Sequence, residues 1–75
     1  MADDFKFEIK ESFGTLSESS KGWTIELNSV SWNDRDPKYD IRSWSEDHKK
    51  MGKGIALSKD EVKKLREILD GLNLD

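Results

Sequence analysis

Basic and aromatic side chains gather in the middle of this 75-residue sequence. Residues 38–53 carry five basic side chains against three acidic ones, although the whole chain has a net charge of −3. An indole ring can stack on any nucleobase, and a lysine or an arginine can neutralise a phosphate. The segment could therefore hold a single strand of nucleic acid, which presents both groups. Its basic members are Lys38, Arg42, Lys49, Lys50 and Lys53.

Trp44 is the aromatic residue that most needs an explanation. In a strand expected over residues 38–45, alternation places Trp44 on the same face as Arg42 and on the face opposite Ile41. An indole on the polar face of a strand either packs against a partner protein or stacks on a base. We therefore expect the strand to present Trp44 to a ligand.

The other two tryptophans depend on how the preceding strand is built. Trp23 is in phase with Leu27, which favours a core position, whereas Trp32 falls on the other parity. Either a bulge near Asn28-Ser29 corrects the phase and brings Trp32 to the core, or the strand is regular and Trp32 joins Trp44 on the polar face. The sequence leaves both alternatives open.

Residues with catalytic or metal-binding potential show no recognisable arrangement. The chain has no cysteine and a single histidine, His48, so neither a thiolate metal site nor a histidine zinc site is expected. Asp34 and Asp36 flank a turn, where aspartate is common for backbone reasons. Gly52-Lys53-Gly54 lacks the spacing of a phosphate-binding loop. We expect no enzymatic activity, no cofactor, no metal and no small-molecule substrate.

Four strands must position these residues. Period-two alternation of apolar residues, or a short apolar run between turn signals, predicts strands over residues 5–13, 23–32, 38–45 and 52–57. In the first strand the apolar residues of one parity are Phe5, Phe7, Ile9 and Phe13, and Gly14 breaks or bends the strand. In the last strand we expect Ile55 and Leu57 to point inward.

A helix follows the strands. Ser58 and Glu61 fit a capping box, which marks the beginning of a helix, and Gly71 is a plausible end. An apolar stripe at helical spacing runs along it, made of Val62, Leu65, Ile68, Leu69 and Leu72. The expected fold class is α+β: a four-stranded antiparallel sheet followed by one C-terminal amphipathic helix, in a single domain over residues 1–75.

The composition suggests that this domain forms a homodimer. Hydrophobic residues make up 33% of the chain and charged residues 39%, so the core of one protomer is thin, and no disulfide can stabilise it. One small sheet covers only part of the helical stripe, so a second protomer could cover the rest. No signal peptide and no transmembrane segment are recognisable, and we expect a cytoplasmic protein without a membrane partner.

Three segments together resemble the transcriptional positive cofactor four family, whose domain is the single-stranded-DNA-binding p15-like coactivator. They are the run V-S-W-N-D at residues 30–34, Y-D-I-R-S-W at 39–44 and K-G-I-A-L-S at 53–58. The sequence is most similar to the short bacterial YdbC-like members, and the resemblance covers about residues 23–70. It implies four strands and a helix, a homodimer joined largely through the helices, and single-stranded DNA bound across paired curved sheets, with no enzymatic activity or cofactor.

The resemblance also implies roles for individual residues. Arg42 is similar to the arginine that contacts the phosphate backbone, and Trp44 to the neighbouring aromatic residue that stacks on bases. Lys53 and Gly54 match a basic-glycine step, and Lys38 is similar to the basic residue that enters the same strand as Arg42. The family often has two basic residues before that glycine, and here Gly52 stands in the first position. The long regulatory tail of eukaryotic members has no counterpart.

The expected function is therefore largely sequence-independent binding of single-stranded DNA, in transcription, replication or repair and, in a bacterium, at the nucleoid. Candidate contacts are Trp23, Trp32, Lys38, Arg42, Trp44, Lys49, Lys53 and Gly54. Two alternatives stay open. One is a protein-interaction module that uses the exposed aromatic surface, and the other is binding of single-stranded RNA.

Overall fold

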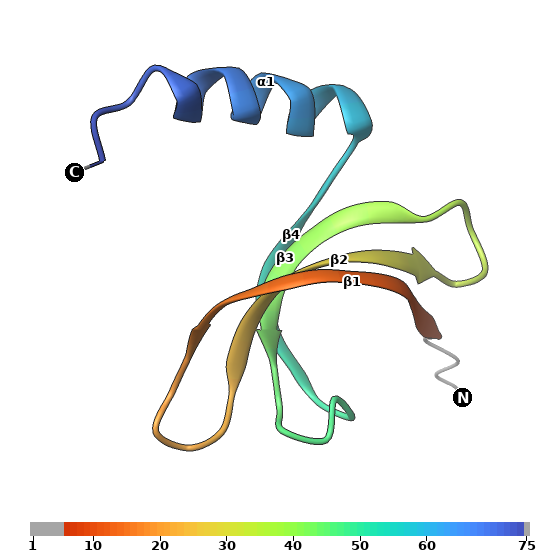
Figure 1. Ribbon diagram of the computed structural model, residues 1–75. Helices are drawn as coiled ribbons and strands as arrows, with labels where there is room; N and C mark the ends of the chain where they lie inside the picture. Colours follow the sequence, from red (N-terminus) through yellow and green to blue (C-terminus); the bar gives the residue numbers. More distant parts are fainter. Residues whose placement is uncertain (1–5, 75) are drawn as a thin grey trace.

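The structure, a computed structural model, describes residues 6–74 and consists of a four-stranded antiparallel sheet followed by one helix (Figure 1). Neighbouring strands in the sheet are also neighbours in the chain. The elements are β1 (Phe7–Glu18), β2 (Thr24–Trp32), β3 (Lys38–Trp44), β4 (Met51–Leu57) and α1 (Lys59–Asp70). The predicted α+β fold is confirmed. Phe5, which we assigned to the first strand, lies outside the described residues.

The β2–β3 pairing decides between the two positions considered for Trp32. It runs from Thr24 opposite Trp44 to Val30 opposite Lys38 without a shift in register. There is no bulge at Asn28-Ser29, so Trp32 lies on the same face as Trp44.

The two faces of the sheet carry different chemistry. We call one the Arg42 face, and its side chains include Phe7, Glu26, Asn28, Val30, Trp32, Asp40, Arg42 and Trp44. We call the other the Ile41 face, and its side chains include Ile25, Leu27, Tyr39, Ile41, Ile55 and Leu57. Aliphatic side chains dominate the Ile41 face, whereas polar and aromatic ones dominate the Arg42 face.

The sheet curls toward the Arg42 face. Phe7 pairs with Trp32 and Trp44 pairs with Thr24, so the two rings start from opposite ends of β2. A flat strand would separate those ends by about 26 Å at roughly 3.3 Å per residue. The centroids of the Phe7 and Trp44 rings are nevertheless 5.3 Å apart. The curvature visible in Figure 1 therefore brings the two ends of the Arg42 face into contact.

The curl has a local cause in β1. Its pairing with β2 shifts at three places, and at each of them β1 carries one residue that has no counterpart on β2: Lys10, Phe13 and Leu16. Such bulges bend a strand and increase its twist. They also change the face to which the later residues of β1 point. Phe13 accordingly stacks on Tyr39 of the Ile41 face, with ring centroids 5.7 Å apart. Our expectation that Phe13 shares a face with Phe7 and Ile9 is wrong for this reason.

The buried core lies on the Arg42 face, contrary to the simple expectation that the aliphatic face is the core. Val30 and Trp44 are completely buried, whereas Ile55 is 54% exposed. The alternation predicted for β4 is confirmed, since Ile55 pairs with Ile41, but Ile55 does not point into a covered core. In one protomer the curl buries the polar and aromatic side chains and leaves aliphatic ones at the surface.

The helix begins as predicted. The Ser58 hydroxyl accepts from the Glu61 backbone N–H at 3.2 Å, and the Glu61 carboxylate accepts from the Ser58 N–H at 2.8 Å, which completes the capping box. The helix ends at Asp70 and is capped by Gly71. No residue of α1 is buried, and the helix stands away from the sheet in Figure 1. Within residues 6–74, no helix has the length and hydropathy to cross a membrane.

Gly54 allows a close approach between β3 and β4. It pairs directly with Arg42, and a Cβ atom at this position would collide with the Arg42 Cβ and lie 2.5 Å from the Ile41 carbonyl oxygen. The collision involves backbone and the base of a side chain, neither of which can swing away. Gly54 therefore fixes the position of Arg42 relative to β4.

We predict that Gly54→Ala destabilises the protein by about 1 to 3 kcal/mol, because the added methyl group forces the strands apart. For a domain of this size each kcal/mol lowers the melting temperature by roughly 4 to 8 °C. Gly14→Ala is the matched control, since a Cβ there meets no atom within 4 Å. Thermal unfolding of the two variants compares them directly, and equal melting temperatures would contradict the role given to Gly54.

Candidate nucleic-acid interface

Arg42 lies at the centre of the candidate interface and is held by a buried carboxylate. Its Nε donates to Asp40 Oδ1 at 2.6 Å and its Nη2 donates to Asp40 Oδ2 at 2.9 Å. Asp40 is completely buried, and the Arg42 side chain is 16% exposed. This bidentate ion pair neutralises the carboxylate and fixes the plane of the guanidinium.

The remaining contacts of Arg42 leave it some capacity to bind an anion. Its Cζ lies 4.7 Å from the centroid of the Trp32 ring, and Nη1 lies 3.7 Å from Met51 Sδ. Nη1 and Nη2 each carry a second hydrogen that none of these contacts uses. The half-buried Trp32 thus supports the guanidinium from one side, and a phosphate could bind at its outer edge.

The structure places Trp44 on the predicted face but buries it. Phe7 packs on it with ring centroids 5.3 Å apart, and the His48 imidazole stacks on it at 5.8 Å with an interplanar angle of 26°. Trp44 has no exposed surface. The expectation that the strand presents Trp44 to a ligand is therefore wrong for the protomer as it stands, because strand parity does not reveal which side chains fold over a face.

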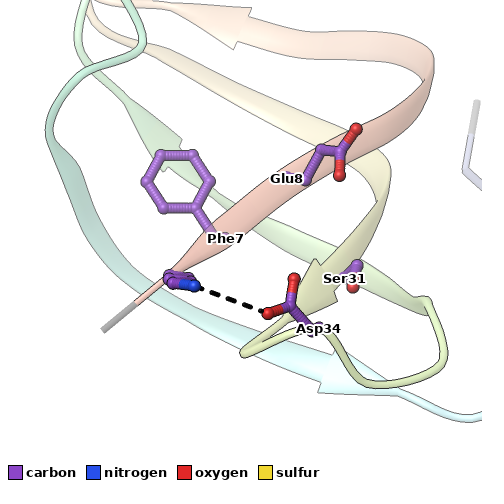
Figure 2. Close-up of a pocket in the computed structure, with 5 residues that line it drawn as sticks. Phe7, Glu8, Ser31 and Asp34 are labelled. Carbon is purple, nitrogen blue, oxygen red and sulfur yellow. Dashed lines mark ion pairs between the residues drawn. The ribbon is translucent and has the colours of Figure 1, made fainter. Parts of the chain in front are cut away.

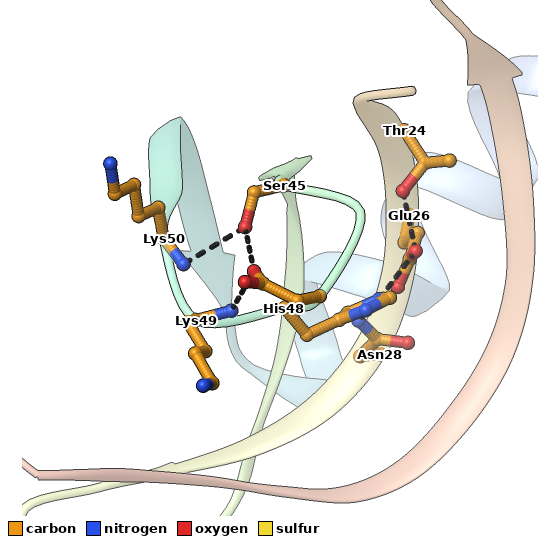
Figure 3. Close-up of polar contacts among 8 residues, drawn as sticks. Thr24, Glu26, Asn28, Ser45, His48, Lys49 and Lys50 are labelled. Carbon is orange, nitrogen blue, oxygen red and sulfur yellow. Dashed lines mark hydrogen bonds and ion pairs between the residues drawn. The ribbon is translucent and has the colours of Figure 1, made fainter. Parts of the chain in front are cut away.

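Glu26 is the centre of a polar network beside Trp44 (Figure 3). Its Oε2 accepts from Thr24 Oγ1 at 2.5 Å and contacts His48 Nε2 at 2.8 Å, and its Oε1 accepts from Asn28 Nδ2 at 3.1 Å. Burial acts to raise the pKa of Glu26, but the hydrogen bonds from Thr24, Asn28 and His48, together with the charge of His48, hold the pKa below its ordinary value. Glu26 is therefore a carboxylate at neutral pH although it is only 6% exposed.

His48 reaches this network from the loop that joins β3 to β4. The loop has its own hydrogen bonds, which include Ser45 Oγ donating to Asp47 at 2.8 Å and the Lys49 N–H donating to Asp47 at 3.0 Å. The Lys49 N–H and the Ser45 hydroxyl hold the pKa of Asp47 below its usual range. His48 itself has a positive φ of 60°, a conformation that favours glycine. The loop thus places the imidazole over Glu26 and Trp44.

The predicted lysines lie at the surface of the protein. Lys38 begins β3, Lys53 lies in β4, and both are exposed. Lys49 and Lys50 are also exposed, and Figure 3 shows their side chains directed away from Glu26. Lys38 pairs with Val30 of the Arg42 face, Lys53 stands next to Gly54 in the outer strand β4, and Lys49 and Lys50 lie in the loop that carries His48. From these positions their long side chains could meet a nucleic-acid backbone that crosses the face.

Trp23 lies elsewhere. It precedes β2 and is half-buried, on the side of Ser43 and Gly52 rather than on that of Arg42. The structure therefore brings Trp32, Arg42 and Trp44 together, with Gly54 beneath Arg42, and does not bring Trp23 to them.

Sequence reasoning missed several members of this face. The polar network beside the buried Trp44 was not among the candidates; it consists of Glu26, Asn28 and His48. One signal was present in the sequence: Glu26 and Asn28 alternate with Ile25 and Leu27, so β2 carries polar side chains on the face of Arg42. The loop conformation that delivers His48 left no such signal.

A pocket of about 340 Å³ lies at the other end of β2, lined by Lys6, Phe7, Glu8, Ser31 and Asp34 (Figure 2). Lys6 Nζ is 3.7 Å from Asp34 Oδ2, and both side chains are largely exposed. Two carboxylates outnumber one ammonium there, so the pocket does not attract phosphate. Within residues 6–74, no group of three or more histidine, aspartate or glutamate side chains could hold a metal ion.

Comparison with known proteins identifies a family that matches most of the sequence. Residues 19–68 match the family described as Transcriptional Coactivator p15 (PC4). That family is known for single-stranded DNA binding and transcription coactivation. The chain is also similar to an uncharacterized protein of Treponema pallidum (strain Nichols), with 52% identity over 73 residues that cover 97% of this chain and 86% of that protein.

We predict that Trp44→Ala costs about 3 to 5 kcal/mol of stability, the usual range for emptying a buried tryptophan site. The cost arises because Phe7 and His48 lose the ring on which they pack. Trp23→Ala, at a half-buried position off this face, should cost less. Chemical unfolding of both variants measures the difference, and a Trp44→Ala protein with unchanged stability would show that Trp44 is not a core residue.

Proposed function

We propose that this chain, which belongs to the Transcriptional Coactivator p15 (PC4) family, binds single-stranded DNA on its Arg42 face and has no enzymatic activity. The observation that carries the proposal is the family match over residues 19–68, because every candidate contact lies within the matched region. These candidates are Trp32, Lys38, Arg42, Trp44, Lys49, Lys53 and Gly54, whereas Trp23 lies within the matched region but away from the Arg42 face.

Phosphate binding is assigned to the basic side chains. Lys38, Lys49 and Lys53 are exposed and free to move toward a phosphate. Arg42 has less freedom, since Asp40 takes two of its N–H groups, but its rigid position suits a fixed contact in the middle of the path. Salt should weaken binding, because phosphate contacts release condensed counterions.

Base stacking is assigned first to Trp32. Its half-buried ring lies under the Arg42 guanidinium, so an arginine and an indole are offered together to a base. Bases must leave their complementary strand before they can stack, so duplex DNA should compete poorly. Phosphate contacts and stacking do not test the 2′-hydroxyl, and single-stranded RNA is the alternative ligand.

We predict that oligo-dT changes the intrinsic tryptophan fluorescence and that the matching duplex binds far more weakly. Lys53→Ala should reduce the dependence of oligo-dT affinity on salt: the slope of log K against log salt concentration should fall by about 0.7, the value for one lost single-strand phosphate contact. Lys53 suits this test better than Arg42, because Arg42→Ala would leave the buried Asp40 without its partner.

Lys64→Ala in α1 is the matched control, since Lys64 is also charged and exposed but lies on the helix and not beside a residue that pairs with Arg42. An unchanged salt slope for Lys53→Ala would move the contact to Lys49 or Lys50. Absence of binding to any single strand would overturn the proposed function, and stronger binding of oligo-U would favour the RNA alternative.

We also propose that the protein is a homodimer joined through its uncovered apolar surfaces. The stripe of α1 is open, with Ile68 55%, Leu69 44% and Leu72 51% exposed, while Val62 and Leu65 are half-buried. On the Ile41 face, Ile25 and Ile55 are also exposed. One chain thus carries two apolar surfaces that its own fold leaves open, and a second copy related by a two-fold axis could cover both.

We predict a solution mass of about twice 8.7 kDa for the wild type, measured by light scattering, and a monomeric or concentration-dependent mass for Ile68→Asp. The aspartate would place a charge in the apolar seam. Lys64→Gln changes the net charge by the same amount on an exposed part of α1 and should stay dimeric. A wild-type monomer whose melting temperature does not depend on concentration would contradict the dimer.

A further inference from the structure

We infer that Glu26, held in place by Asn28, forms a base-reading site in which a nucleobase replaces the His48 imidazole against Trp44, and that this site favours bases that carry an amino group over thymine. The inference rests on the proposed binding of single-stranded DNA and adds a sequence preference to it.

The imidazole occupies the position that a base would take. It is a flat nitrogen heterocycle, nearly parallel to the Trp44 ring at an angle of 26°, and its Nε2 lies 2.8 Å from Glu26 Oε2. A base stacked on Trp44 would make the same two contacts with its face and its edge. The His48 side chain is 41% exposed and that of Glu26 only 8%, so the imidazole is the outer layer over the carboxylate.

The groups beneath the imidazole are hydrogen-bond acceptors. Glu26 Oε2 would be left with only Thr24 as a donor, while Asn28 Nδ2 would still donate to Oε1. Asn28 Nδ2 must face the carboxylate, which can only accept, so the amide orientation is fixed and Asn28 Oδ1 points elsewhere. That oxygen is buried without a hydrogen-bond partner in residues 6–74. It lies on the side of the amide away from Glu26, so the acceptor that a base would meet is the carboxylate that has lost its imidazole donor, and this acceptor calls for a ligand that donates.

This chemistry discriminates between bases. Cytosine and adenine present an amino group on the Watson–Crick edge, and guanine presents an amino group beside a ring N–H. Thymine presents a single N–H between two carbonyl oxygens, and these oxygens would face the Glu26 carboxylate and be repelled by it. The Nε1–H of Trp44 also lacks a partner in the described part of the chain, but it lies in the ring plane and cannot serve a base stacked on the ring face.

The imidazole can leave without dismantling its loop. The loop is closed by bonds that do not use the His48 side chain, such as Ser45 N–H to the Lys50 carbonyl at 2.9 Å and Lys50 N–H to Ser45 Oγ at 3.0 Å. His48 is also the residue of the loop with a positive φ, so the loop holds it in a conformation that a non-glycine residue adopts at some cost. A rotation of the side chain alone would open the site.

The affinities of oligo-dC and oligo-dT of equal length, measured at neutral pH and fixed salt, test the inference on the wild type. We expect oligo-dC to bind about 5- to 150-fold more tightly, the discrimination associated with one well-made base contact. NMR provides a second readout that needs no variant, because His48 is the single histidine of the chain. Its ring protons should lose the shift caused by the Trp44 ring when oligo-dC binds.

Three variants separate base reading from simple charge. Glu26→Gln should abolish the preference for oligo-dC, since an amide can also donate to thymine, whereas Glu46→Gln removes the same charge from an exposed part of the loop and should keep the preference. His48→Ala removes the competing imidazole and should tighten oligo-dC binding several-fold.

The outcomes are distinguishable from those of the proposed function. Equal affinity for oligo-dC and oligo-dT, or His48 ring signals that do not move on binding, would overturn the base-reading site and leave single-strand binding in place. If no oligonucleotide binds, both the proposed function and this inference fail. If Glu26→Gln does not fold, the wild-type preference and the His48 signals still decide the matter.

Discussion

The contact between Phe7 and Trp44 depends on the curl of the sheet, and most of the described features depend on that contact. It joins residues whose partners lie at opposite ends of β2, so it forms only because β1 carries three extra residues that bend the sheet. Once the curl is in place, Asp40 loses its access to water and requires Arg42 as a partner. Glu26 and Asn28 are enclosed at the same time, and their polar atoms must be satisfied within the face.

The curl also inverts the usual division between a buried aliphatic face and an exposed polar face. The protomer buries Trp44, Asp40 and Asn28 and leaves Ile25 and Ile55 at the surface. A buried polar network of this kind defines one arrangement of side chains, since each misplaced group would lose a partner. The open aliphatic surface provides no such definition by itself, and we assign it to association between protomers.

The sequence predicted the strands, the helix and its capping box, because periodicity and caps are local signals. The pairing of β2 with β3 resolved the position of Trp32, which depended on a register that no single strand contains. The faces of Phe13 and Trp44 were not predictable in the same way. Phe13 changes face through a bulge in β1, and Trp44 is covered by a ring from β1 and by an imidazole from a loop. Both facts depend on contacts between residues far apart in the chain.

The bulges in β1 have one more consequence, which concerns one of the two edges of the sheet. β1 is an outer strand, and a regular outer strand offers evenly spaced backbone N–H and C=O groups to which another chain can add. Extra residues at Lys10, Phe13 and Leu16 interrupt that spacing along its length. A chain with exposed aliphatic side chains is thereby discouraged from extending its sheet at the β1 edge, which leaves the β4 edge and contacts between faces as its routes of self-association.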